Sequence, residues 1–328
     1  MNETPPIFAP GFYEAPNLQA WPGRPSDPSL GPQYWHQSIF LHHLPSEWPG
    51  EEDGGVALLG YACDEGVKRN LGRAGAVMGP MAIRYKLGPL AYHHPAHRVM
   101  DVGNIVCPND ELEDVQFALS EGVRWLQDHR KYTLLLGGGH DLAYGHAKGL
   151  LRSLPETQRL GVINFDAHFD LRPYDGMAHS GTPFSQLLDE YPQRVSYLAV
   201  GIQPASNPPH VFERAKTLGA SYIPVEQSRI TRLEDVWTAV KAFIDRVDCL
   251  CLSLDLDGIA AAYAPGVSAP SPLGMDPIFV WELAARIFTS RKVIACNVAE
   301  LNPELDQDLI TANLAARWVD SVVGWWSV

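Results

Sequence analysis

The chain has 328 residues and a mass of 36.2 kDa, so it is long enough to bury a large hydrophobic core. Apolar residues make up 46% of it, which excludes wholesale disorder. The formal net charge of −13 argues against a general nucleic-acid binder, which needs a basic surface. It does not argue against an anionic substrate, because one well-placed arginine acts at contact distance.

The chain shows no sign of membrane insertion or export. It has no apolar run as long as a membrane span, and the N-terminus MNETPPIFAP lacks a basic region followed by an apolar one. We therefore expect a cytoplasmic protein without a membrane partner. The five cysteines include no CxxC pair, so free buried thiols are expected. A redox-dependent bond between Cys63 and Cys249 or Cys251 remains an alternative.

Residues 1–50 are rich in Pro and Trp and lack a sustained period, which indicates an extended arm packed on the body. Residues 51–328 are predicted to form one domain. Near-continuous apolar runs, typical of strands buried on both faces, occur at 56–62, 132–138, 160–166, 196–202, 220–226, 249–255 and 292–300. Amphipathic helical segments lie between them at 114–129, 233–247 and 277–289. This alternation predicts an α/β fold, a single doubly wound domain with a mostly parallel central sheet and helices on both faces.

Polar residues follow four of the predicted strands. His140 comes after YTLLLGGG, a triplet follows LGVINF, Asp255 and Asp257 come at the end of CLCLSLDLD, and Glu300 follows KVIACNVA. Ligand sites in such sheets lie outside the carboxyl ends of the strands. We therefore expect these side chains to meet at one edge. The triple glycine 137–139 lacks the Lys and Ser/Thr of a P-loop and indicates close backbone approach near His140.

The triplet belongs to the stretch NFDAHFDLRP (164–173), where Asp166, His168 and Asp170 occupy every second position. On an extended backbone all three would project from one face. Carboxylates brought together resist joint ionisation, and a divalent cation removes that penalty. The alternative is a polar loop whose acidic residues are there by chance.

Together these positions offer four carboxylates and two imidazoles without a thiolate. Two divalent ions would balance the four negative charges. Oxygen and nitrogen ligands favour manganese, with zinc, iron or nickel as alternatives. A two-metal site lowers the pKa of bound water and so supplies a nucleophile at neutral pH. The predicted reaction class is hydrolysis at an electrophilic carbon or phosphorus. The predicted ligands are His140, Asp166, His168, Asp170, Asp255 and Asp257.

Three motifs, GGGHD (137–141), DAHFD (166–170) and SLDLDG (253–258), resemble the metal motifs of the ureohydrolase family, the arginases and agmatinases. The resemblance covers residues 55–320 and implies two Mn²⁺ per chain in a doubly wound α/β fold. It implies that one ion takes His140, Asp166, Asp170 and Asp255. The other would take Asp166, His168, Asp255 and Asp257. It also implies a homo-oligomer.

Within the family, several stretches resemble the formimidoylglutamase subgroup, namely 64–84, 169–172, 180–184, 261–274 and 299–308. Arg172 stands where arginases carry an asparagine that faces the substrate's α-carboxylate. An arginine there suits a dicarboxylate substrate and would repel a cationic one such as agmatine. The alternative for Arg172 is a structural salt bridge.

The resemblance assigns further roles near the metals. Glu300 matches the acid that faces the amidinium end of the substrate, its alternative being a capping or surface acid. Asp170 would serve both as ligand and as proton carrier to the departing amine. His179 precedes Ser180, which aligns with a family histidine, so His179 is a candidate proton shuttle or else an exposed loop residue. Ser180 is a further candidate for substrate binding. Asn70, in the loop after the first predicted strand, is another, with a surface or fold-stabilising role as its alternative. Asn297 stands where relatives often have an aspartate, with no predicted consequence.

The leading hypothesis is a binuclear manganese hydrolase of a linear amidine, with N-formimidoyl-L-glutamate as the preferred substrate and L-glutamate and formamide as products. A guanidino-acid hydrolase that releases urea is the nearest alternative. A catalytically silent relative is a third, which the complete set of predicted ligands opposes. In each case the partner is a small molecule.

Overall fold

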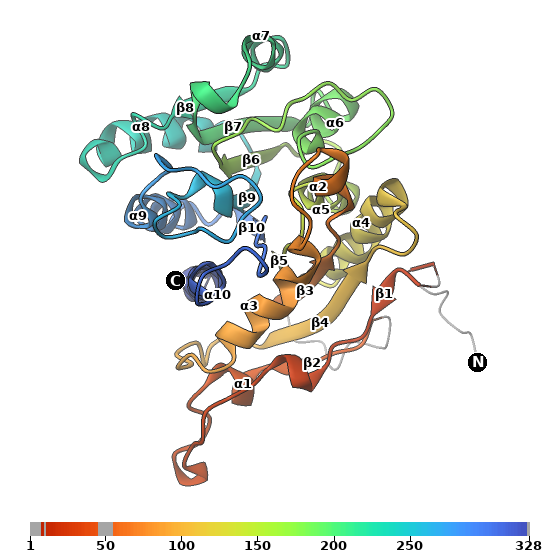
Figure 1. Ribbon diagram of the computed structural model, residues 1–328, viewed down its shortest axis with the longest axis vertical. Helices are drawn as coiled ribbons and strands as arrows, with labels where there is room; N and C mark the ends of the chain where they lie inside the picture. The colour runs from red at the N-terminus through yellow and green to blue at the C-terminus, as the bar shows by residue number, and fades with distance from the viewer. Residues whose placement is uncertain (1–7, 10, 45–54, 327–328) are drawn as a thin grey trace.

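The computed structural model describes residues 8–9, 11–44 and 55–326. Ten strands form one sheet in the order β1-β4-β3-β5-β10-β9-β6-β7-β8, with β2 also paired to β4 (Figure 1). Among the strand pairs of the described residues, β1–β4 is antiparallel and the others are parallel. The strands are β1 (Tyr13–Glu14), β2 (Phe40–Leu41), β3 (Val56–Ala62), β4 (Val99–Val106), β5 (Tyr132–Leu136), β6 (Leu160–Phe165), β7 (Val195–Ile202), β8 (Ser221–Pro224), β9 (Cys249–Asp255) and β10 (Val293–Ala299).

Helices cover both faces of the sheet, as Figure 1 shows. One layer holds α3 (Gly79–Leu87), α8 (Leu233–Ile244), α9 (Pro277–Phe288) and α10 (Ile310–Trp326). The other holds α4 (Leu112–Asp128), α5 (Leu142–Ser153), α6 (Pro183–Glu190) and α7 (Pro209–Thr217). Two short helices, α1 (Trp35–Ser38) and α2 (Glu65–Arg69), lie in connections. The predicted fold class is confirmed.

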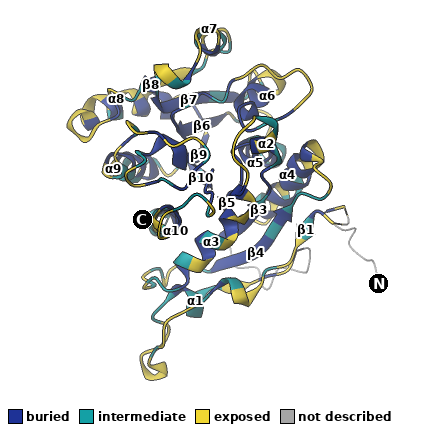
Figure 2. Ribbon diagram, viewed as in Figure 1, coloured by how far each residue is buried: buried dark blue, intermediate teal, exposed yellow. Residues whose placement is uncertain are grey.

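The core consists of two clusters, one on each face of the sheet. Strand side chains alternate between them: in β3, Val56 and Leu58 join the α3/α8/α9/α10 side, whereas Ala57 and Leu59 join the α4/α5/α6 side. The central strands are buried along their length and the helices expose only their outer faces (Figure 2). This two-sided burial explains why the strand sequences read as continuous apolar runs.

The N-terminal segment contributes to the sheet edge. Its strands β1 and β2 both pair with β4, and Trp21 and Trp35 are buried. The indole N–H of Trp21 donates to Asp101 in β4 at 2.8 Å. The predicted boundary near residue 50 falls in 45–54, outside the described residues, so the division at that point stays a prediction.

Strand β4, the long strand next to β3, was not predicted from the sequence. Its sequence VMDVGNIV is interrupted by Asp101, Gly103 and Asn104, so it shows no apolar run. Asp101 is buried because Arg84 of α3 pairs with it at 2.7 Å, and the same guanidinium donates to Asn104. A buried ion pair thus replaces apolar side chains in this strand.

The proposed bond between Cys63 and Cys249 or Cys251 is wrong. All five thiols are free. Cys63 follows β3, whereas the other two lie in β9, and β5 and β10 separate these strands. Cys63 and Cys107 instead line one cavity at the ends of the neighbouring strands β3 and β4. Within the described residues no helix combines the length and apolar character needed to cross a membrane.

One buried histidine should make the fold sensitive to acid. His146 of α5 is fully buried against the sheet, and burial lowers the pKa of its imidazole from 6.5 to about 3. Below pH 6.5 the unfolded chain binds a proton at His146 that the folded chain does not bind. The free energy of unfolding should therefore fall by ~1.4 kcal/mol per pH unit from this group as pH decreases from about 6 to 4.

Urea unfolding across this pH range, with a chelator present to remove any bound metal, measures the effect. The His146→Gln variant should lose this part of the slope, whereas His210→Gln, which removes an exposed imidazole of α7, should keep it. Equal slopes in wild type and His146→Gln would contradict the prediction.

Candidate metal centre and substrate pocket

The predicted site residues come from the ends of four strands that are neighbours in the middle of the sheet, β5, β10, β9 and β6. His140 lies just beyond β5 and Glu300 directly after β10, while Asp255 ends β9 and Asp166 follows β6. Since these strands are parallel, their carboxyl ends share one edge. The expectation from the sequence that the polar groups meet there is therefore met.

The local backbone at Asp166, His168 and Asp170 differs from the prediction. Strand β6 ends at Phe165, so the triplet lies in a loop and does not share a strand face. Asp166 Oδ1 accepts the N–H of His168 at 2.7 Å, which turns the chain, and Asp170 has a left-handed backbone with φ of 50°. The side chains converge because of this turn and not because of strand alternation.

A similar turn forms at the end of β9. Asp255 Oδ1 accepts the N–H of Asp257 at 2.9 Å across the short turn Leu256–Gly258. Gly258 packs against the backbone of Asp166, where a Cβ would lie 2.7 Å from the Asp166 Cα. The two acidic turns therefore fit together only with glycine at position 258.

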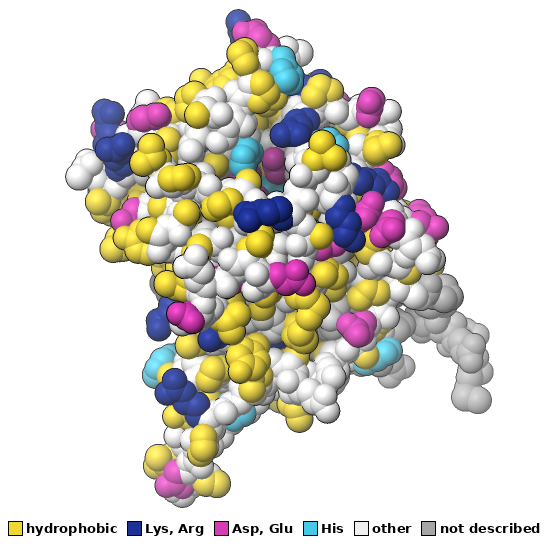
Figure 3. All heavy atoms as spheres, in the orientation of Figure 1, with side chains coloured by type: hydrophobic (Ala, Val, Ile, Leu, Met, Phe, Trp, Pro, Cys, Tyr) yellow, Lys and Arg dark blue, Asp and Glu magenta, His cyan; other side chains and the backbone are white. Residues whose placement is uncertain are grey.

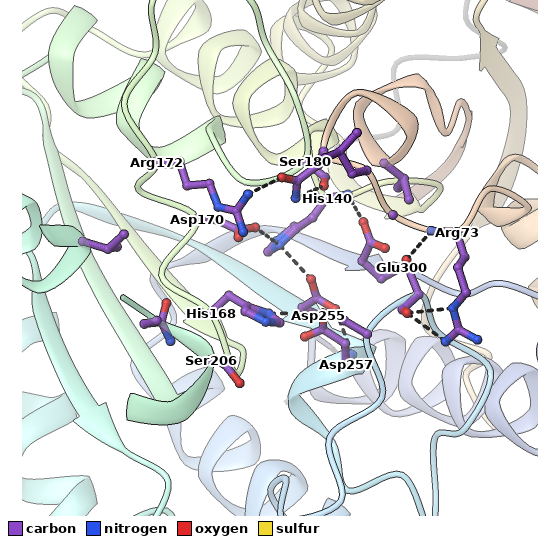
Figure 4. A pocket seen from close by; sticks show the side chains of 18 of the residues that line it. Arg73, His140, His168, Asp170, Arg172, Ser180, Ser206, Asp255, Asp257 and Glu300 are labelled. Carbon is purple, nitrogen blue, oxygen red and sulfur yellow. Dashed lines mark hydrogen bonds and ion pairs between the residues drawn. The ribbon is translucent and has the colours of Figure 1, made fainter. Parts of the chain in front are cut away.

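The six predicted ligand side chains form two groups that share Asp166. Nδ1 of His140 lies 3.3 Å from Asp166, 2.8 Å from Asp170 and 2.9 Å from Asp255. Nδ1 of His168 lies 3.4 Å from Asp166 and 3.3 Å from Asp257. The first group matches the set implied for one ion. The second lacks Asp255, whose bridging role stays a prediction. In Figure 4 His140 lies against Asp170 and Asp255, and His168 against Asp257.

Without a bound cation, full ionisation of the clustered carboxyl groups is electrostatically unfavourable. Burial, and then the charge of Asp255, raises the pKa of Asp257 well above its usual range. Burial and the neighbouring Asp166 raise the pKa of Asp170 to about 6. Burial lowers the pKa of the His140 imidazole. The neighbouring carboxylates, above all the charge of Asp255, outweigh burial and raise this pKa well above 6.5. Without a cation the cluster would therefore hold protons.

The donor chemistry fits divalent ions. All six ligand atoms are carboxylate oxygens or imidazole nitrogens, the set that suits manganese. Asp257 Oδ1 is buried and has no hydrogen-bond partner in the described part of the chain. A buried acceptor without a donor is costly, and a bound cation would satisfy it.

Glu300 is a buried carboxylate beside this cluster. Its side chain is 6% exposed, so the surface alternative is wrong. Oε1 accepts the backbone N–H of His140 at 2.8 Å, and burial together with Asp255 and Asp257 raises its pKa well above the usual value. Its φ is 67°, a strained conformation for a residue other than glycine. The backbone strain at Asp170 and Glu300 coincides with the two predicted catalytic carboxylates.

A cavity of about 300 Å³ opens above the cluster. In Figure 3 it is a hollow with acidic and histidine side chains inside it and basic side chains around it. Arg172, Asn70 and Ser180 line its mouth as a linked row: Arg172 donates to Asn70 at 2.5 Å, and Asn70 donates to Ser180 at 3.0 Å (Figure 4). Among the described residues Arg172 forms no ion pair, so the structural salt bridge considered for it is not found.

His179 is not brought into the cavity. It is half-buried beside it, and its Nδ1 accepts the N–H of Gly181 at 3.1 Å. Burial and the charge of Arg172 lower the pKa of its imidazole. Nothing in this arrangement supports its predicted shuttle role, which stays a prediction.

Arg73, which was not predicted from the sequence, also lines the cavity mouth. Its side chain donates to the carbonyls of Val267 and Ser268 at 2.8–3.0 Å, and its backbone N–H donates to Ser268 Oγ at 2.7 Å. Arg73 thereby ties the loop after α2 to the loop after β9, on the side of the site opposite Arg172 (Figure 4). Its position three residues after Asn70 was the only available signal.

Comparison with known proteins identifies the family. The chain is 39% identical to the formimidoylglutamase of Geobacillus sp. (strain WCH70) over 309 residues, 94% of each protein. It superposes on a Bacillus subtilis formimidoylglutamase structure with a TM-score of 0.81, 22% identity and coverage of 93% and 94%. It superposes on a Trypanosoma cruzi formiminoglutamase structure with Mn²⁺ with a TM-score of 0.76 and 25% identity, covering 86% of this chain and 96% of that one. The model of the arginase family matches residues 54–324, and the chain therefore belongs to that family.

Proposed function

We propose that the protein is a manganese-dependent formimidoylglutamase. It would hydrolyse N-formimidoyl-L-glutamate to L-glutamate and formamide, consuming one water and breaking the bond between the formimidoyl carbon and the glutamate nitrogen. The curated relatives support this substrate, and the fit of six ligands to two Mn²⁺ supports the chemistry. The observation that carries the choice within the family is Arg172, an arginine at the cavity mouth without an acidic partner among the described residues.

In this proposal one ion is held by His140, Asp166, Asp170 and Asp255, and the other by Asp166, His168, Asp255 and Asp257. Bound there, the two ions would supply a nucleophile at neutral pH by lowering the pKa of water. The protein's contribution is to fix the donors and to provide a shaped, largely dry cavity around them.

The remaining side chains bind and orient the substrate. Glu300 Oε1 is engaged by the N–H of His140, so we assign Oε2 to the amidinium end. Arg172, oriented by Asn70 and Ser180, would bind a carboxylate of the glutamate part at the mouth. Asp170, at the base of the cavity, would give a proton to the departing glutamate nitrogen.

We also infer that the protein is cytoplasmic and assembles as a homo-oligomer. The exposed apolar side chains of Met81 and Tyr85 on α3, and of Met78 just before it, support a self-association surface. Sedimentation of the purified protein measures the assembly, and a monomer at micromolar concentration would contradict it.

A substrate panel tests the reaction. The manganese-loaded protein should release formamide and glutamate from N-formimidoyl-L-glutamate, while agmatine should be a poor substrate because Arg172 would repel its cationic amine end. Release of urea from guanidinobutyrate, with no turnover of the formimidoyl compound, would move the assignment to a guanidino-acid hydrolase.

The metal centre is tested by replacing Asp255 with Asn. This change removes a charge that faces His140 and should reduce bound manganese below the two ions per chain expected for the wild type, with loss of activity. Elemental analysis after loading and dialysis measures the content. Asp245→Asn is the matched control, because Asp245 is exposed and its ion pair, with Lys241 at 2.8 Å, is also exposed. Wild-type manganese content in Asp255→Asn would refute the ligand assignment.

Arg172 is tested by substitution with Ala. Loss of a hydrogen-bonded charge pair costs about 1.5–3 kcal/mol, so KM should rise about 10- to 100-fold at unchanged manganese content. Arg172→Lys should recover only part of this, since lysine lacks the bidentate geometry. Arg286→Ala, which removes a partly exposed arginine of α9 paired with Glu234, is the control. An unchanged KM in Arg172→Ala would remove Arg172 from the substrate site.

A further inference from the structure

A buried chain of polar side chains extends from the metal cluster into the protein. It begins at Nε2 of His140, which lies 2.9 Å from Ser253 Oγ. Ser253 is 2.7 Å from Asn297 Oδ1, and Asn297 Nδ2 is 3.2 Å from Nδ1 of His146. Nε2 of His146 lies 2.9 Å from Thr133 Oγ1. All five residues are at most 1% exposed.

The sheet register builds this chain. Asn297 in β10 is paired with Ser253 in β9, and Ala295, two residues before Asn297, is paired with Thr133 in β5. The residues two positions away from them on the same strands pack on the α4/α5 side of the sheet. His146 of α5 covers this face. Polar residues on three adjacent strands at the same face of a sheet core are unexpected unless they have a joint role.

The hydrogen bonds of this chain have a single consistent direction. His140 can bind a metal ion through Nδ1 only if its proton is on Nε2. Nε2–H then donates to Ser253, the Ser253 hydroxyl donates to Asn297 Oδ1, and Asn297 Nδ2–H donates to His146. The reverse direction would place a proton on Nδ1 of His140, the atom that faces Asp166, Asp170 and Asp255.

Asn297 determines this direction because its amide offers an acceptor at one end and a donor at the other. The donor end is held by His146, whose neutral imidazole accepts at Nδ1 and donates to Thr133 at Nε2. With the amide fixed in this way, only its oxygen can face Ser253. The chain carries no charge, so it adds none to the four carboxylates.

We propose that Asn297 is a positioning residue of the metal centre, which acts through Ser253 to hold His140 in the tautomer and orientation that bind metal at Nδ1. This rests on the proposed manganese site but not on the identity of the substrate. The effect is expected at the ion held by His140, because the hydrogen bonds from Thr133 through Ser253 lead to His140 and not to His168 or Asp257. Such supporting hydrogen bonds typically account for 10- to 100-fold in metal affinity.

The test is manganese affinity, measured by competition with a chelator and by the electron paramagnetic resonance signal of free Mn²⁺. In Asn297→Ala one of the two ions should bind about 10- to 100-fold more weakly while the other is unchanged. Ser253→Ala, a smaller change in the same chain, should have the same effect. Asn297→Asp keeps the acceptor for Ser253 and should restore most of the affinity.

Cys296→Ala is the matched control. Cys296 precedes Asn297 in β10, is equally buried, and packs on the opposite face of the sheet, so its loss weakens the core without touching the chain. Wild-type affinity for both ions in Asn297→Ala and Ser253→Ala, or an equal loss in Cys296→Ala, would overturn the inference. A wild-type protein that binds no manganese would instead refute the metal centre itself.

Discussion

The arrangement of the site depends on the repulsion among four carboxylates held at one edge of the sheet. Asp166, Asp255 and Asp257 are buried together with a fifth acid, Glu300, and Asp170 is largely buried beside them. The folded protein therefore concentrates negative charge where water screens it poorly. Two dications remove this cost, and they bind only if the donors are already aimed at them. The surrounding structure is best understood as the means by which a sheet holds mutually repelling groups in place.

Different parts of the fold provide this support. Parallel strands bring the donors to one edge, and the turns formed by Asp166 and Asp255 use one carboxylate oxygen for the backbone while the other remains near the imidazoles. Left-handed backbones at Asp170 and Glu300 aim the remaining acids inward. Behind His140 the neutral chain through Ser253 and Asn297 fixes the imidazole without further charge. Each of these features restricts the orientation of a metal ligand, and none of them adds a further ligand.

The sequence predicted the parts of this site that local patterns encode. Spacing at every second residue identified Asp166, His168 and Asp170, and strand runs placed their partners at the same edge. The strand backbone predicted for that triplet was wrong. A turn closed by an aspartate side chain can place polar residues at every second position just as a strand does. Strand β4, where an ion pair between Arg84 and Asp101 replaces the apolar pattern, was not predicted.

The polar chain behind His140 was not predictable from spacing. Thr133, His146, Ser253 and Asn297 are ordinary residues on four separate elements, and only the register of three strands makes them neighbours. Asn297 was noted as a departure from the family, but its role can be inferred only when its two partners, Ser253 and His146, are known. Residues that support a site through long-range pairing therefore leave little local signal, whereas the ligands themselves do.

The inner side of the site is supported by the sheet, whereas its mouth is formed by loops. The groups that hold the metal ions are therefore separate from those that select the substrate. His140 is buried and supported by the sheet, whereas the side chain of His168 is 26% exposed and lies next to the cavity. Arg172, Asn70 and Arg73 at the mouth come from loops that do not supply the inner supports. Loops tolerate substitution better than core strands do. A change at the mouth can therefore alter which amidine is accepted while the metal centre, anchored in the sheet, keeps its geometry.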